Sequence, residues 1–114
     1  MSTVSLFITH QCKPGMRDAV HAIWRKHMLA SIEANAAHLA YAYCFHATDP
    51  NVVLAYQEYA DQAASDAFVA TPQYGAYLTE VEPLLAAQPV VAVGRPRWVK
   101  GGVKRFGFLP DESA

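Results

Sequence analysis

The sequence has few cysteines, almost no net charge and no long apolar runs. Its two cysteines, Cys12 and Cys44, belong to no CxxC pair of the kind that holds zinc or exchanges disulfides. We expect both to be free thiols, as is usual in a reducing compartment. The net charge of -1 leaves no excess of Lys and Arg to attract phosphate backbones or anionic lipids. Nucleic acid and membranes are therefore not expected as partners.

Targeting and catalytic signatures are also missing. No apolar run reaches the roughly 18 residues of a membrane span, and residues 1–7 lack the basic start and long apolar core of a signal peptide. We therefore expect a soluble, cytoplasmic protein. The sequence contains no GxSxG elbow, P-loop or GxGxxG fingerprint, which disfavours the hydrolases and nucleotide enzymes that use them.

What the sequence does have is apolar and aromatic residues in regular patterns. Of its 114 residues 53% are hydrophobic, enough for the core of a single domain over residues 1–114. Residues 4–12 are rich in β-branched and aromatic types and end at Lys13-Pro14-Gly15, which predicts a strand and then a turn. Between residue 16 and residue 35 apolar residues recur at helical spacing, which predicts an amphipathic helix. They are Val20, Ile23, Trp24 and Met28.

The second half of the chain predicts a hairpin, a broken helix and a last strand. Residues 38–47 alternate in a strand pattern, and a turn at residues 48–51 leads into a strand at residues 52–59. Asp61 is a good N-cap for a helix that runs to about residue 85 with a break at Thr71-Pro72. Residues 90–93 then form a strand. The order β-α-β-β-α-β is that of the ferredoxin-like fold, an α+β class with an antiparallel sheet.

This order of elements has consequences for the sheet and the tail. Right-handed crossovers make the first and third strands neighbours and place the second at an edge, which separates Cys12 from Cys44. Both helices cover one sheet face, so the other face, which has apolar residues of its own, needs cover from a second copy of the chain. The C-terminal extension, residues 95–114, mixes aromatic and basic residues. We expect it to pack on the body or on the partner subunit rather than to bind single-stranded nucleic acid.

Four short segments carry a resemblance to a known family. They are Lys13-Pro14-Gly15, Asp49-Pro50, Tyr56-Gln57-Glu58-Tyr59-Ala60-Asp61 and Thr71-Pro72-Gln73-Tyr74. In their order and spacing, over residues 4–95, the sequence resembles the antibiotic biosynthesis monooxygenase (ABM) family. The resemblance implies a dimeric α+β barrel in which each subunit holds a ligand pocket between its sheet and its helices. Relatives in that family oxidise phenols and hydroquinones without metal or flavin, degrade haem, or isomerise a phosphorylated signal.

The sequence departs from the family pattern at histidine positions. Phe68 and Gln73 stand where the family commonly has histidine, and the first strand carries Thr9 and His10 where haem-degrading relatives use an asparagine. Haem is therefore not an expected cofactor, and the resemblance to the phenol-oxidising relatives implies none.

Two residues are candidates for the chemistry. His27 lies on the apolar stripe of the first helix, so its imidazole is expected to point toward the sheet, where it could take a proton from a phenol. The alternative is an ordinary core histidine. Glu58, near the end of the third strand, could orient His27 or hold a substrate hydroxyl if it faces the pocket. If it faces the other way, it could pair with an arginine across a dimer interface.

Aromatic residues are the candidates for substrate binding, because their rings could stack on a planar ligand. They are Trp24, Tyr41, Tyr43, Phe68, Tyr74 and Tyr77. A stripe of aromatic residues is also typical of a plain core. His10 and His46 could join His27 or Glu58 at a metal, but no pair has the local spacing of metal ligands, and no metal is expected.

The sequence thus predicts a homodimeric, cofactor-independent monooxygenase that oxidises a small phenolic or quinol-like molecule with O2. Two alternatives stay open. One is an isomerase or other proton-shuttling enzyme that uses the same His27 and Glu58. The other is a dimeric ligand-binding module without catalysis.

Overall fold

The computed structural model describes residues 3–100 of the chain. Strands β1 (Val4–Gln11), β2 (His38–Phe45), β3 (Val52–Tyr59) and β4 (Val90–Gly94) form one sheet in the order β2-β3-β1-β4, with every neighbouring pair antiparallel. The first and third strands are neighbours and the second lies at an edge, as predicted. The ferredoxin-like α+β fold is confirmed.

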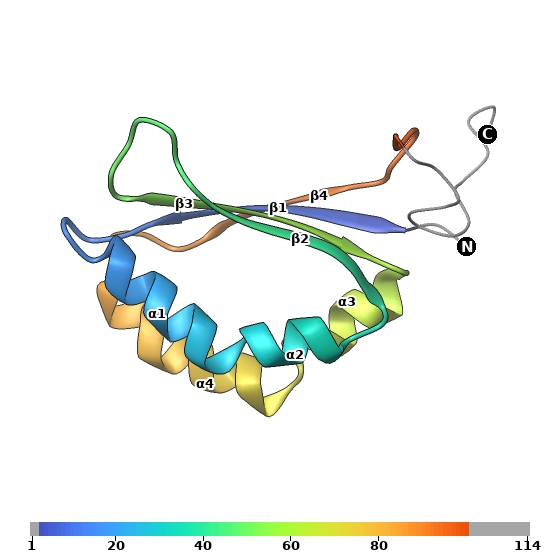
Figure 1. Ribbon diagram of the computed structural model, residues 1–114, viewed down its shortest axis with the longest axis horizontal. Coiled ribbons are helices and arrows are strands. Elements are labelled where there is room, and N and C mark those ends of the chain that lie inside the picture. Colours follow the sequence, from blue (N-terminus) through green and yellow to red (C-terminus); the bar gives the residue numbers. More distant parts are fainter. Residues whose placement is uncertain (1–2, 101–114) are drawn as a thin grey trace.

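The helices all lie against one face of this sheet (Figure 1). They are α1 (Arg17–His27), α2 (Leu29–Ala34), α3 (Gln62–Val69), α4 (Pro72–Val81) and a 3-10 turn, η1 (Glu82–Leu84). No helix within residues 3–100 is long and apolar enough to cross a membrane.

Turn and capping residues begin these elements where the sequence places them. Gly15 has φ 77°, a left-handed conformation that glycine adopts without strain. The Asp61 carboxylate accepts a hydrogen bond from the Ala64 amide at 2.8 Å and so caps α3. The Thr71 hydroxyl accepts one from the Tyr74 amide at 3.3 Å and caps α4. The predicted break at Thr71-Pro72 is therefore confirmed.

The first predicted helix differs from the expectation, because it bends at Met28 into α1 and α2. Met28 has φ -110° and ψ -34°, yet its amide still donates to the Trp24 carbonyl at 2.8 Å. The helix therefore changes direction while this hydrogen bond is kept, and the bend is visible between the two labelled segments in Figure 1. Met28 itself is buried in the core.

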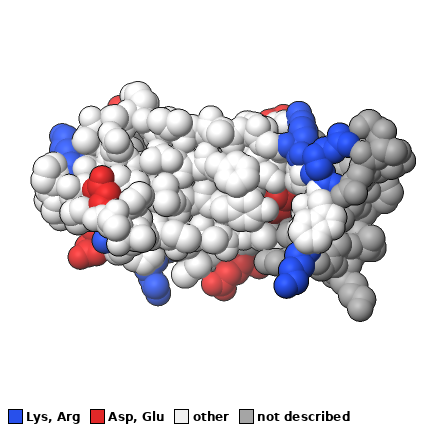
Figure 2. All heavy atoms as spheres, turned by 90° about the horizontal axis from the view of Figure 1, so that it is seen from above, with Lys and Arg blue, Asp and Glu red and all other residues white. Residues whose placement is uncertain are grey.

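Strand alternation gives the sheet two different faces. Leu6 pairs with Gln57 and Ile8 with Ala55, and these side chains face the helices. On the opposite face Phe7 and Val90 stay 51% and 65% exposed. Figure 2 is seen from that side and shows a largely uncharged surface. Residues 3–100 thus leave apolar side chains of this sheet face exposed, as predicted, although Ser5 and Glu58 on the same face are buried.

The thiols and the start of the C-terminal extension can also be compared with the expectations. Cys12 is buried, Cys44 is exposed, and both are free, as predicted. Trp98 is 70% exposed, so this side chain does not pack on the body of its own chain. The other aromatic residues of the extension, Phe106 and Phe108, lie outside the described residues.

Candidate ligand site

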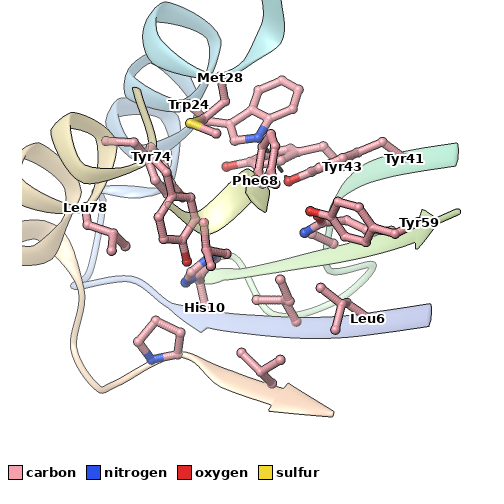
Figure 3. A pocket seen from close by; sticks show the side chains of 17 residues that line it. Leu6, His10, Trp24, Met28, Tyr41, Tyr43, Tyr59, Phe68, Tyr74 and Leu78 are labelled. Atoms are coloured by element: carbon pink, nitrogen blue, oxygen red, sulfur yellow. Dashed lines mark hydrogen bonds between the residues drawn. The ribbon is translucent and has the colours of Figure 1, made fainter. Parts of the chain in front are cut away.

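A cavity of about 140 Å³ lies between the sheet and the helices. Its floor comes from β1 and β3: Leu6, Ile8, His10, Ala55, Gln57 and Tyr59. Its roof comes from α1, α3 and α4 and from the residue between α1 and α2: Trp24, Met28, Phe68, Val69, Tyr74, Tyr77 and Leu78. The β2 edge adds Tyr41 and Tyr43, and β4 with the residue before it adds Val91 and Pro89. Figure 3 shows these side chains pointing into a common space.

The size of this cavity limits what it can hold. An apolar protein cavity of about 150 Å³ takes up benzene. A space of about 140 Å³ therefore has room for one six-membered ring with small substituents. Val91 on its β4 side is 52% exposed, so we place the entrance at this edge.

All six aromatic residues predicted to bind substrate line the cavity. The rings of Trp24 and Tyr43 have centroids 4.4 Å apart, and those of Phe68 and Tyr74 are 6.1 Å apart in an edge-to-face arrangement. Edge-to-face and tilted contacts of this kind make a rigid aromatic wall. Their contact with a substrate stays a prediction.

The lining is uncharged, since it contains no Lys, Arg, Asp or Glu among the described residues. Some of its polar groups satisfy one another. Trp24 Nε1 donates to the hydroxyl of Tyr41 at 3.1 Å, and the Tyr59 hydroxyl donates to the side-chain oxygen of Gln57. Burial raises the pKa of Tyr41 to about 12, so this phenol stays protonated. The site is therefore built for a neutral ligand.

Two of the fully buried polar atoms without a partner among the described residues belong to residues that line the cavity. They are Nδ1 of His10 and the hydroxyl oxygen of Tyr43, and both are buried. Burial lowers the pKa of His10 from its usual 6.5, because a charged imidazole is costly away from water. Burial likewise raises the pKa of Tyr43. Both groups are therefore neutral near pH 7.

His27 lies outside this cavity. Its Nε2 pairs with a carboxylate oxygen of Glu80 on α4, and Lys26 contacts the same carboxylate at 3.2 Å. The expectation that the His27 imidazole points toward the sheet is wrong. Trp24 and Met28, four residues apart, face the sheet, whereas His27 lies at the edge of their stripe and meets α4.

Glu58 lies on the opposite face of the sheet and is fully buried. Its Oε1 accepts hydrogen bonds from Ser5 at 2.5 Å and Tyr56 at 2.7 Å, and its Oε2 has no partner within residues 3–100. Alternation along β3 gives the cavity position to Gln57 instead. The expected contact with His27 or with a substrate hydroxyl is therefore wrong, and pairing across a dimer interface stays a prediction.

The histidines considered as metal ligands lie apart. His46 Nδ1 accepts hydrogen bonds from the amides of Thr48 and Asp49 in the hairpin turn. His10 faces the cavity from β1. Within the part of the chain that the structure describes, no group of three or more His, Cys, Asp or Glu could hold a metal ion.

Sequence reasoning gave His10 no role in the pocket, although a signal for it was present. Leu6, Ile8, His10 and Cys12 alternate along one strand, so a residue that shares the core face with two aliphatic side chains must be buried with them. His10 is 8% exposed. The imidazole that faces the cavity is therefore that of His10 and not that of His27.

Fold and cavity together define a ferredoxin-like domain with an aromatic ligand pocket. The family model described as antibiotic biosynthesis monooxygenase matches residues 3–80. The chain belongs to this family. A comparison with curated proteins finds no match.

Solved structures share the fold. Rv0793 from Mycobacterium tuberculosis superposes with a TM-score of 0.75 at 23% identity, over 83% of this chain and 95% of that one. A protein named antibiotic biosynthesis monooxygenase gives 0.73 at 20% identity, over 80% and 95%. A conserved protein from Methanosarcina mazei gives 0.77 at 12% identity, over 83% and 93%. Identities this low show the fold alone.

Proposed function

We propose that this protein is a monooxygenase that oxidises a small, neutral, single-ring phenol with O2 and without a metal or organic cofactor. The observation that carries the proposal is the cavity, which is about 140 Å³ in size and lined by aromatic and uncharged side chains. Family membership supports an oxidoreductase. A phosphorylated substrate, as in the isomerase alternative, is disfavoured because no cationic side chain lines the pocket among the described residues.

The reaction balances without an external reductant. Loss of the phenolic proton makes the ring electron-rich enough to reduce O2. One oxygen atom then enters the ring at a C–H carbon and the other leaves as water, which converts the phenol into a quinone. A dry pocket favours this course, because it keeps water from reactive intermediates.

The assembly and the compartment belong to the same proposal. The exposed apolar residues Phe7, Leu54 and Val90 on one sheet face support a homodimer in which a second copy of the chain covers them. Two free cysteines support a reducing, cytoplasmic setting.

Oxygen uptake by the purified protein, after treatment with a metal chelator, tests the proposal. We expect uptake with single-ring phenols and a quinone that carries one atom from isotope-labelled O2. Ala55→Leu, which fills the cavity floor, should abolish uptake, while Ala22→Leu at an exposed site on α1 should not. Binding of phenols without uptake would favour the non-catalytic binding module, and a protein that neither binds nor oxidises them would contradict the proposal.

A further inference from the structure

Two residues that line the cavity from different strands each have a fully buried polar atom without a partner within residues 3–100. Nδ1 of His10 rises from β1 and the hydroxyl of Tyr43 from β2, and each is buried without a partner among the described residues. In Figure 3 the His10 side chain points from its strand toward the helices and the cavity. Buried polar groups are rarely left unsatisfied, and such groups in a native structure indicate a missing partner.

Two other hydrogen-bonding groups in the lining of this site are already engaged. The Tyr41 hydroxyl has Trp24 as its donor, and the Gln57 oxygen has the Tyr59 hydroxyl. The hydroxyls of Tyr74 and Tyr77 also line the cavity, but among the described residues only the His10 and Tyr43 atoms are both fully buried and unpaired there, so these two gain most from a hydrogen bond with a ligand. Tyr41 also provides a matched comparison for Tyr43, because both are tyrosines on β2 that line the same cavity.

The protonation states give the two groups opposite characters. A neutral imidazole has one nitrogen that accepts a hydrogen bond, and burial keeps His10 neutral by lowering its pKa. A phenol that stays protonated donates, and burial keeps Tyr43 in that state by raising its pKa. His10 thus offers an acceptor and Tyr43 a donor, in a cavity whose walls are mostly aromatic and aliphatic.

We propose that His10 and Tyr43 determine which ring the cavity accepts, with His10 accepting a hydrogen bond from the ligand hydroxyl and Tyr43 donating to a second oxygen. This inference rests on the proposed function and names the two groups that bind the oxygen atoms of the substrate. When the phenolic O–H bond breaks, its proton forms an N–H bond on His10 and the negative charge stays on the ring. His10 is then the base of the reaction.

Calorimetric titration with phenol and with toluene tests this pair, since the two ligands differ by a hydroxyl in place of a methyl group. In His10→Leu the affinity for phenol should fall about tenfold, the value of one hydrogen bond, while the affinity for toluene stays within twofold. Tyr43→Phe should weaken binding of hydroquinone, which has a second oxygen, by a similar factor and leave toluene unchanged. Ala22→Leu, at an exposed site on α1, is the control and should keep both preferences.

The outcomes separate this inference from the proposed function. If phenol and toluene weaken equally in His10→Leu, or if neither changes, water satisfies these groups and the inference is wrong even where oxygen uptake persists. If the wild-type protein binds neither ligand, both proposals are wrong. Tyr43→Phe removes a single oxygen atom, so it gives a result even if His10→Leu does not fold.

Discussion

Unpaired polar groups in the pocket lower the stability of the folded protein, and a ligand that forms hydrogen bonds with them offsets this loss. An unsatisfied buried group destabilises the folded protein by about 1–3 kcal/mol, whereas a group that is paired contributes about 1 kcal/mol. The structure holds one tyrosine hydroxyl of each kind on the same strand, Tyr43 unpaired and Tyr41 paired with Trp24. The unpaired hydroxyl of Tyr43 therefore lowers the stability of the folded protein, and a hydrogen bond with a ligand would offset this loss.

This contrast predicts opposite effects of the same substitution. Tyr43→Phe should raise the free energy of unfolding by about 1 kcal/mol, because it removes an unsatisfied hydroxyl. Tyr41→Phe should lower it by about 1 kcal/mol, because it leaves the Trp24 N–H without an acceptor. Urea denaturation measures both. Equal shifts of the same sign would show that Tyr43 has a partner in solution.

Buried histidines predict how stability depends on pH. Burial lowers the pKa of His10 and of His38, which stacks on Tyr59 with ring centroids 4.3 Å apart. Below the unfolded value of 6.5 the unfolded chain binds protons that the folded chain does not, so acid favours unfolding. The free energy of unfolding should be highest above this pH. It should decrease as the pH is lowered further, by at most about 1.4 kcal/mol per pH unit for each histidine.

Denaturation curves between neutral pH and mildly acidic pH check this. His10→Leu should flatten the acid side of the profile, because one proton-binding difference is removed. An unchanged slope in that variant would mean that His10 is protonated in the folded state, which would also weaken its assignment as a hydrogen-bond acceptor.

At the scale of elements, α1 and α4 are joined outside the cavity. His27 and Lys26 on α1 both contact Glu80 on α4, and hydrogen bonds from His27 and then Lys26 lower the pKa of the Glu80 carboxyl. Exposed pairs of this kind contribute little to stability. They connect the two helices that roof the pocket.

This position predicts that His27 is dispensable for the chemistry. His27→Ala should change the rate of phenol-dependent oxygen uptake by less than about twofold, while His10→Leu should lower it about a hundredfold, as expected for loss of a general base. Steady-state oxygen electrode measurements on the two variants decide between the two histidines. A strong dependence of the oxygen-uptake rate on His27 would favour His27 as the base of the reaction. It would also require α1 to rotate toward the sheet.

The same elements show what could be predicted from the sequence. Period-two alternation placed Tyr41 and Tyr43 together, Asp61 was predicted as an N-cap, and Thr71-Pro72 was predicted as a helix break, because these signals are local. Glu58 differs from Gln57 by one position, so its face depended on which side of the sheet the helices cover. That choice is made by tertiary packing, which a local pattern does not contain.

At the scale of the whole molecule, the uncovered sheet face predicts a homodimer. Phe7, Leu54 and Val90 are 51%, 37% and 65% exposed there, and contiguous apolar surface of this kind marks interaction sites. Phe7→Asp should convert the dimer to a monomer in sedimentation equilibrium, because it buries a charge against apolar neighbours. Ala22→Asp, on the exposed side of α1, should leave the dimer intact.

The monomeric variant also tests whether one chain makes a complete site. The cavity lies between the sheet and the helices of the same chain, while Phe7 points from the other face of the sheet. Phe7→Asp should therefore bind toluene and phenol with affinities within about twofold of the wild type. If ligand binding is lost together with the dimer while the fold is retained by circular dichroism, the partner subunit must hold the sheet in its binding conformation. The site would then be a property of the assembly and not of the chain.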